Sequence, residues 1–379
     1  MATPAIDPRG EGSMERTLRL MLCGDVMTGR GIDQIMPQSV DPALFEPVVR
    51  SAKEYITLAE KQHGAIPRNV KPGYIWGDAL AIMEEIKPDV RIANLETAVT
   101  TSDDRQPKGI NYRMHPANVA CLQAAQLDVC TLANNHVLDW GRQGLRETLE
   151  VLQDAGIATA GAGSDLKAAK APAIQQTGEG RVLVFAGGHP DSGIEPGWAA
   201  TASRPGVRLL RDFSASTVAS IAQTIQAQRR DGDLVVYSIH WGGNWGYDIS
   251  EEHQAFARML IDEAGVDLVF GHSSHHPRGM EVYNKKLILY GCGDLINDYE
   301  GITGYEQFRP DLRVLYFPLL NQHGDLKGLD MTVLDTARFA LHRPAREDVG
   351  WLRERMAAAS RESGVDVRSK GDNMLELHW

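Results

Sequence analysis

Carboxylate, amide and imidazole side chains recur in short polar clusters along this chain of 379 residues. Carboxylate oxygens, amide oxygens and imidazole nitrogens together suit borderline divalent ions such as Zn, Mn or Fe. Three imidazoles and two carboxylates are more ligands than one tetrahedral ion takes, and a carboxylate can bridge two ions. The set therefore predicts a site for two divalent metal ions, in an enzyme. Its members are Asp25, Glu96, Asn135, His240, His272 and His275.

The segment GHSSHH, residues 271–276, is the most specific of these clusters, because three histidines so close together rarely serve packing. Taken alone, each of the other clusters has an ordinary structural explanation. Asp25 and Glu96 fit a turn or a helix cap, the tandem Asn134-Asn135 fits a turn, and His240 fits a hydrogen-bonded core histidine. The metal interpretation depends on their being one group.

Each cluster follows a short apolar stretch that is typical of a buried strand. These stretches are residues 18–23, 89–93, 128–133, 233–239 and 267–270, and helical patterns at 77–86, 142–155, 214–230 and 251–264 alternate with them. The alternation predicts a layered α/β fold. Because ligands of open α/β sheets bind at the carboxyl ends of strands, we expect the clusters to converge at one edge.

Composition limits the classes of partner. The chain has 39 basic and 50 acidic residues, a net charge of −11, which argues against nucleic acid or an anionic membrane as the main partner. The four cysteines form no CxxC pair, and most lie in apolar runs, so we expect buried free thiols and a reducing cytoplasm. No apolar stretch reaches the length of a membrane span, and residues 1–16 lack a signal-peptide core and are predicted to be a disordered leader.

Several longer motifs carry a resemblance to a known family. They are LMLCGDVMTGR, IANLETAVT, LANNHVLDWGRQGLRETLEVLQDAGI, YSIHWGGNWGY and VDLVFGHSSHHPRGMEVYNKKLILYG. Over residues 18–297 the chain resembles the CapA family of poly-γ-glutamate capsule synthesis, within the calcineurin-like metallophosphoesterase superfamily. The resemblance implies a four-layer αββα sandwich with a two-metal site at one edge, over a domain of residues 17–340. Residues 341–379 are predicted to form a helical extension.

The resemblance also implies roles for single residues. Asp25, Glu96 and Asn135 are expected as ligands, with Glu96 as the bridge, and the imidazoles are expected from His240, His272 and His275. His136 follows the ligand asparagine, where the superfamily has its acid, and Asp139 is spaced to orient it.

The chain departs from the superfamily at three places. Met27 stands where the first motif, Asp-x-His, has its histidine. The last motif is His-x-x-His followed directly by another histidine, so His275 and His276 compete for the ligand role. The segment GCGDLINDYEG, residues 291–301, replaces the usual SLGNF of the CapA family, and its acidic and amide side chains line either a substrate pocket or a solvated loop.

Three functions remain open from the sequence. The first is hydrolysis of a phosphoester or a γ-glutamyl-type amide in a peptide or amino-acyl substrate by a metal hydroxide, with His136 as the acid. The second is epimerisation of the C-terminal residue of a ribosomal (lasso) precursor peptide, with His136 and His276 as proton carriers and Asp294 as a third candidate. The third is a non-enzymatic part in capsule assembly.

Overall fold

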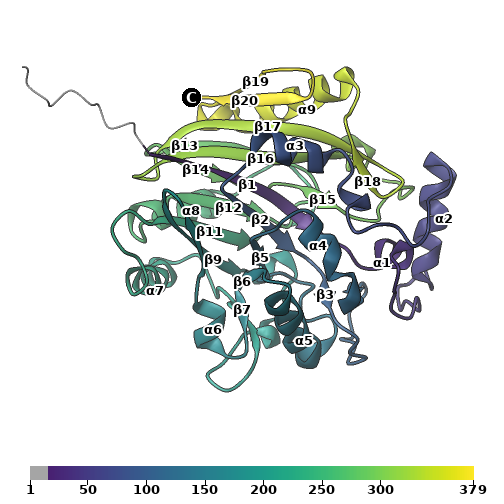
Figure 1. Cartoon of the computed structure of the whole chain (residues 1–379). Coiled ribbons are helices and arrows are strands. Elements are labelled where there is room, and N and C mark those ends of the chain that lie inside the picture. Colours follow the sequence, from purple (N-terminus) through teal and green to yellow (C-terminus); the bar gives the residue numbers. More distant parts are fainter. Residues whose placement is uncertain (1–15) are drawn as a thin grey trace, which may run out of the picture.

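Two large sheets form the centre of the protein, and the fold is mixed α/β as predicted. The computed structural model describes residues 16–379, so nearly all of the predicted leader lies outside the described residues. The first sheet has ten strands in the order β19-β20-β17-β16-β1-β2-β5-β6, with β15 beside β1 and β18 beside β17. The second has six, in the order β13-β14-β12-β11-β9-β8. Figure 1 shows the two sheets lying against each other.

The strands of the first sheet are β1 (Thr17–Val26), β2 (Val90–Leu95), β5 (Val129–Thr131), β6 (Ala158–Ala160), β15 (Asp294–Ile296), β16 (Leu312–Asn321), β17 (Leu326–Ala337), β18 (Ala340–His342), β19 (Asp366–Ser369) and β20 (Met374–His378). Those of the second are β8 (Ala173–Thr177), β9 (Gly180–Gly188), β11 (Leu234–His240), β12 (Leu268–His272), β13 (Met280–Tyr283) and β14 (Lys286–Leu289). Two short pairs complete the set: β3 (Ala98–Val99) with β4 (Arg113–Met114), and β7 (Ala162–Gly163) with β10 (Gly206–Val207).

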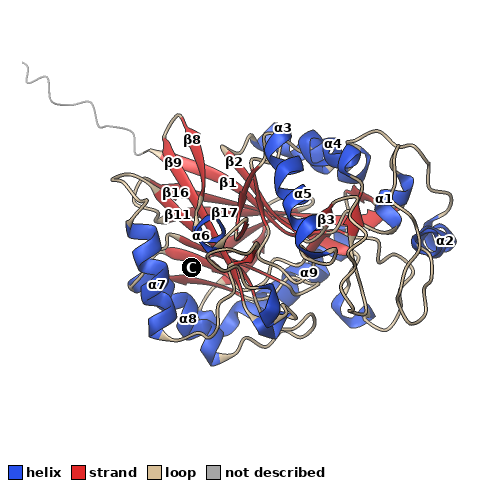
Figure 2. Ribbon diagram, turned by 90° about the horizontal axis from the view of Figure 1, so that it is seen from below, coloured by secondary structure: helices blue, strands red, loops and turns tan. Residues whose placement is uncertain are grey.

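Helices surround the two sheets. They are α1 (Gly31–Ile35), α2 (Ala52–His63), α3 (Ala79–Ile86), α4 (Ala120–Ala124), α5 (Gly141–Asp154), α6 (Leu166–Lys170), α7 (Ala215–Gln226), α8 (Glu251–Asp262) and α9 (Arg346–Ser360). In Figure 2, α7 and α8 flank one side of the strands, and α3, α4 and α5 flank the other. No helix within residues 16–379 has the length and apolar character that a bilayer crossing needs.

Alternating side chains of the buried strands separate the core into three clusters. On β1, Leu20 and Leu22 point between the sheets and meet Val236 of β11 in one cluster. Met21 of the same strand points the other way, into the cluster beneath α3, α4 and α5. On the far side of the second sheet, β11 and β12 pack against α7 and α8 in the third cluster, around Phe256. Strands buried on both faces explain the continuous apolar runs of the sequence.

The C-terminal segment differs from the helical extension that was predicted for residues 341–379. It contains α9, but β19 and β20 follow and extend the ten-stranded sheet beyond β17. The strand signal is weak because β20 has only five residues and alternates between buried and half-buried positions. Pairing with β17, distant in sequence, decides its conformation.

Candidate metal site

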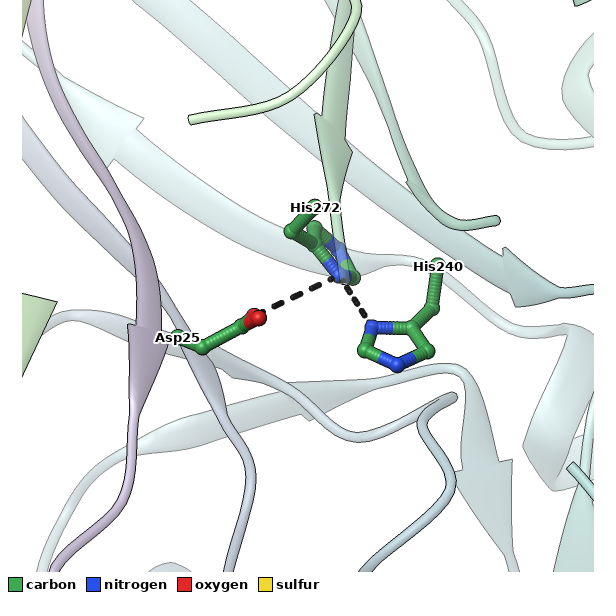
Figure 3. A group of neighbouring side chains, drawn as sticks. All are labelled: Asp25, His240 and His272. Atoms are coloured by element: carbon green, nitrogen blue, oxygen red, sulfur yellow. Dashed lines mark hydrogen bonds and ion pairs between the residues drawn. The ribbon is translucent and has the colours of Figure 1, made fainter. Parts of the chain in front are cut away.

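The carboxyl ends of β1, β11 and β12 bring three of the predicted ligands together. Asp25 is the last residue but one of β1 in the ten-stranded sheet, while His240 and His272 stand opposite each other at the ends of β11 and β12. All three side chains are buried, and one ligand atom of each lies within 4.8 Å of the others. Figure 3 shows the three side chains pointing toward one another across the gap between the sheets.

The hydrogen-bond partners of the two histidines favour one assignment of the ring protons. Ser238 donates its hydroxyl proton to Thr131 (3.1 Å), so it accepts from Nε2 of His272 (2.7 Å), and Nδ1 of His272 carries no proton. Nε2 of His240 faces the amide oxygen of Asn135 at 3.2 Å, which only accepts. Nδ1 of His240 therefore also presents a lone pair.

Two lone pairs face each other in this arrangement. Nδ1 of His240 lies 2.7 Å from Nδ1 of His272, and a carboxylate oxygen of Asp25 lies 3.8 Å from the latter. Burial lowers the pKa of His272 to about 3 and holds the pKa of His240 well below its usual value, so both rings are neutral at pH 7. Neutral imidazoles and a carboxylate that converge without a proton between them fit a divalent cation.

A second group shares Asp25 with the first. It consists of Asp25, His275 and Asp294, all buried, again with one ligand atom of each within 4.8 Å of the others. Asp294 reaches this place because β15 runs parallel to β1 and sets Asp294 opposite Asp25. The close approach requires glycine at Gly24, where a Cβ would lie 1.7 Å from the carbonyl oxygen of residue 293. Asp294, predicted as a proton carrier, thus lies among candidate ligands.

Glu96 lies beside Asp25 with one oxygen unsatisfied. Its Oε2 is buried without a hydrogen-bond partner among the described residues. Burial, then the charge of Asp25, raises the pKa of Glu96 well above its usual value, and burial with the charge of Asp294 raises the pKa of Asp25 to about 7. Such crowded carboxylates are stable as anions only beside cations. Asp25, rather than the predicted bridge Glu96, is common to both groups.

His136 and Asp139 are paired as the sequence predicts. Nδ1 of His136 lies 2.6 Å from Asp139, and its Nε2 lies 3.7 Å from Glu96. Because Asp139 only accepts, the proton is on Nδ1, and the Nε2 lone pair points toward the site. Lys108 from the loop after β3 also contacts Asp139 (2.8 Å) and the backbone carbonyl of Asn135.

His275 and His276 take different directions. His275 lies 2.9 Å from Asp294, and although burial opposes its charge, Asp294 raises the pKa of His275. His276 turns away from both groups of ligands. Its ring stacks on Phe308 (centroids 4.7 Å apart), and its Nε2 accepts from the backbone of Gly246. The structure brings only His275 into the site.

Residues 291–301, which replace the SLGNF segment, do not form a solvated loop, and only part of the segment lines a cavity. Its acidic and amide side chains are buried and engaged within the protein. Asn297 donates to Asp294 at 2.7 Å and so orients that carboxylate. Asp298 forms an ion pair with Arg30. Glu300 lies 2.6 Å from His63 of α2, in the wall of a cavity of about 430 Å³.

Sequence reasoning missed several neighbours of the site. Asn94 donates to Asp25 at 2.7 Å, and although it stands in the motif NLE, its type alone gave no role. Lys108 lies in a loop without a strand-end pattern, so no signal marked it. Tyr112 and Tyr299 place their hydroxyl oxygens 2.9 Å apart beside the site, from segments 187 residues apart. Only the tertiary structure reveals such a pair.

The fold and the site together define a class: mixed α/β proteins that gather buried carboxylates and imidazoles at the strand ends of two facing sheets. Residues 19–299 match the family described as "Bacterial capsule synthesis protein PGA_cap". This chain belongs to that family.

Two named relatives support the assignment. A "Probable polyglutamine synthesis accessory protein" of Mycobacterium tuberculosis is 46% identical over 364 residues, covering 94% of this chain and 95% of the relative. The "PGA biosynthesis protein CapA" of Bacillus subtilis is 26% identical over 320 residues, covering 83% of this chain and 71% of that protein. A solved Plasmodium structure, "GAP50 the anchor in the inner membrane complex", covers 84% of each chain at 10% identity and a TM-score of 0.36.

Proposed function

We propose that this chain is a metal-dependent hydrolase with two metal ions at the strand ends of a four-layer, metallophosphoesterase-like sandwich. The observation that carries the proposal is that Asp25 belongs to two separate groups of converging ligands, one with His240 and His272 and one with His275 and Asp294. Asn135 lies beside the first group, with its amide oxygen 3.2 Å from Nε2 of His240. A carboxylate common to two groups is the arrangement that a two-ion centre needs.

Bound divalent cations would polarise a substrate oxygen and make water a stronger acid, which is the chemistry of hydrolysis at neutral pH. The residues of the chain would supply proton transfer and orientation. Asp139 holds the His136 ring through Nδ1 at 2.6 Å, so Nε2 faces the site and is placed to carry a proton to the leaving group. Burial lowers the pKa of His136 to about 4, so its Nε2 is unprotonated at rest. It would first take the proton that the attacking water releases and then pass that proton to the leaving group.

The substrate class that we propose is a peptide or amino-acyl compound with an anionic group, cleaved at a phosphoester or γ-glutamyl-type amide. The names of the relatives refer to PGA or polyglutamine synthesis. Lys108 lies close to His136, with Nζ 3.4 Å from its Nδ1, and its side chain is 21% exposed. An ammonium group in that position can attract a substrate carboxylate in an otherwise acidic protein.

Metal analysis combined with turnover tests this proposal. The purified protein should bind two Mn²⁺ or Zn²⁺ ions and release p-nitrophenol from bis(p-nitrophenyl) phosphate or p-nitroaniline from γ-glutamyl-p-nitroanilide. The His240→Ala/His272→Ala double variant should lose metal and turnover. A His323→Ala/His378→Ala double variant, which removes two imidazoles that lie outside both groups, should retain both. Full turnover in metal-free wild-type protein would contradict the proposal.

One observation favours epimerisation as a second candidate. The site holds two imidazole–carboxylate pairs, His136 with Asp139 in the loop after β5, and His275 from the loop after β12 with Asp294 of β15. If only the group around His240 takes a metal ion, the second pair is free to exchange a proton with a Cα. Incubation of candidate peptides in deuterium oxide separates the two: a mass gain of one unit without cleavage indicates epimerisation. A metal-loaded protein without either activity would favour the capsule-assembly alternative.

A further inference from the structure

Two tyrosines meet beside the site, one against His136 and the other against His275. The hydroxyl oxygens of Tyr112 and Tyr299 are 2.9 Å apart. The Tyr112 ring stands edge-on to His136 at 4.4 Å between centroids, and the Tyr299 ring stands edge-on to His275 at 5.4 Å. The pair therefore spans the distance between the two imidazole–carboxylate pairs.

One hydroxyl proton of this pair has no good acceptor. Two phenols carry two O–H protons, and a single O···O contact uses one of them. The other is donated by Tyr299 to the thioether sulfur of Met27 at 3.8 Å. Sulfur is a weak acceptor, so this donor is available to an oxygen that enters the site. Met27 stands where the metallophosphoesterase motif has a histidine.

A buried arginine holds the two rings in place. The guanidinium of Arg30 lies over the rings of Tyr112 (4.6 Å) and Tyr299 (5.7 Å), and it is bound by Asp298 and by Glu46 at 2.9 Å. Arg30 has φ 48°, a left-handed conformation that is costly for a residue with a side chain. The surrounding ion pairs hold it there, so the hydroxyls are fixed before any substrate arrives.

We propose that the Tyr299 hydroxyl donates a hydrogen bond to the substrate oxygen that gains negative charge during the reaction, in place of its contact with Met27. The inference rests on the proposed hydrolase function and names Tyr299 as a further residue that contacts substrate. The carboxylates of Glu96 and Asp294, which lie near Tyr299, would repel such an oxygen. A neutral O–H donor that offsets this repulsion would therefore stabilise the transition state strongly. Loss of one donor of this kind lowers kcat by about 10²–10³-fold.

Tyr299→Phe tests the proposal, because it keeps the ring against His275 and removes only the hydroxyl. In the Mn²⁺-loaded protein we expect unchanged metal content, a small fall in melting temperature because the buried Tyr112 hydroxyl loses its acceptor, and a fall in kcat for bis(p-nitrophenyl) phosphate of about 10²-fold or more. Inhibition by orthovanadate, which resembles the transition state, should weaken by about tenfold or more, and inhibition by inorganic phosphate should weaken less. Tyr283→Phe removes a hydroxyl on the β13–β14 hairpin and should change nothing.

A second variant covers the case in which Tyr299→Phe does not fold. Met27→Gln offers an amide oxygen to the same O–H and should compete with the substrate, so kcat and vanadate affinity should fall while metal content stays constant. If the wild type shows metal-dependent turnover and both variants keep its kcat and its inhibition by vanadate, the role of Tyr299 is overturned and the hydrolase function is not. A wild-type protein without metal-dependent turnover would instead overturn the hydrolase function, and this inference with it.

Discussion

Replacing Asp25, the carboxylate common to both ligand groups, should make the metal-free protein more stable. The same change should make the protein less stable when metal is present. In the fold, burial and the charge of Asp294 raise the pKa of Asp25 from 3.8 to about 7. A carboxyl group with a raised pKa binds its proton more tightly in the folded state than in the unfolded state. Its contribution to stability therefore falls as pH rises from 3.8 to about 7, and the full cost is present above pH 7.

The size of the effect follows from this shift and from two hydrogen bonds. The shift corresponds to about 4 kcal/mol at about 1.36 kcal/mol per unit. Asn at this position cannot accept from both Asn94 and the backbone of Ser273, which bond the two oxygens of Asp25 at 2.7 and 3.2 Å. Losing one of them costs about 1 kcal/mol. Asp25→Asn should therefore stabilise the metal-free protein by about 3 kcal/mol at pH 8, or about 4 °C in Tm for a chain of this length.

Thermal unfolding at pH 8, with EDTA and with Mn²⁺, measures both halves of the prediction. Wild-type protein should gain about 2.7 kcal/mol when Mn²⁺ is present at about 100 times its Kd, and Asp25→Asn should gain nearly nothing. Asp33→Asn is the matched control, because Asp33 is equally buried but is bonded by His115 and Asn118 away from both ligand groups. Its response to Mn²⁺ should equal that of wild type. An Asp25→Asn variant that is less stable than wild type in EDTA would refute the reasoning.

Three further predictions concern the surroundings of the site. Because burial lowers the pKa of His136 to about 4, the unfolded chain binds a proton between pH 6.5 and 4 that the fold excludes. Between pH 7 and 5, the free energy of unfolding of the metal-free wild type should therefore fall by about 2 kcal/mol more than that of His136→Gln. Urea unfolding at the two pH values measures this difference. Asp139→Asn should keep metal content and lower kcat by about 10–100-fold, and an unchanged kcat would argue against its orienting role. Gly24→Ala places a Cβ 1.7 Å from the carbonyl oxygen of Gly293, so soluble yield and metal content should both drop, whereas wild-type Tm would contradict the close approach.

Much of the fold was readable because its strands are buried on both faces. The stretches predicted at residues 89–93, 233–239 and 267–270 correspond to β2, β11 and β12, and the helix predicted at 251–264 begins with α8 at Glu251. Short strands without an apolar run were not predicted. β15 has three residues, and its conformation depends on pairing with β1 and on the absence of a side chain at Gly24.

The sequence by itself determined which residue types stand at the strand ends, and hence the metal-friendly chemistry of Asp25, His240 and His272. It also determined the family, because the motifs are long and ordered. Only the tertiary structure decided which atoms face one another. It places Asp25 in two groups of ligands and stacks the ring of His276 on Phe308, away from the site. The contacts of Asp25 join two sheets and a parallel strand, β15, that is distant in sequence. Side-chain direction at a shared edge is a property of packing, which residue spacing does not encode.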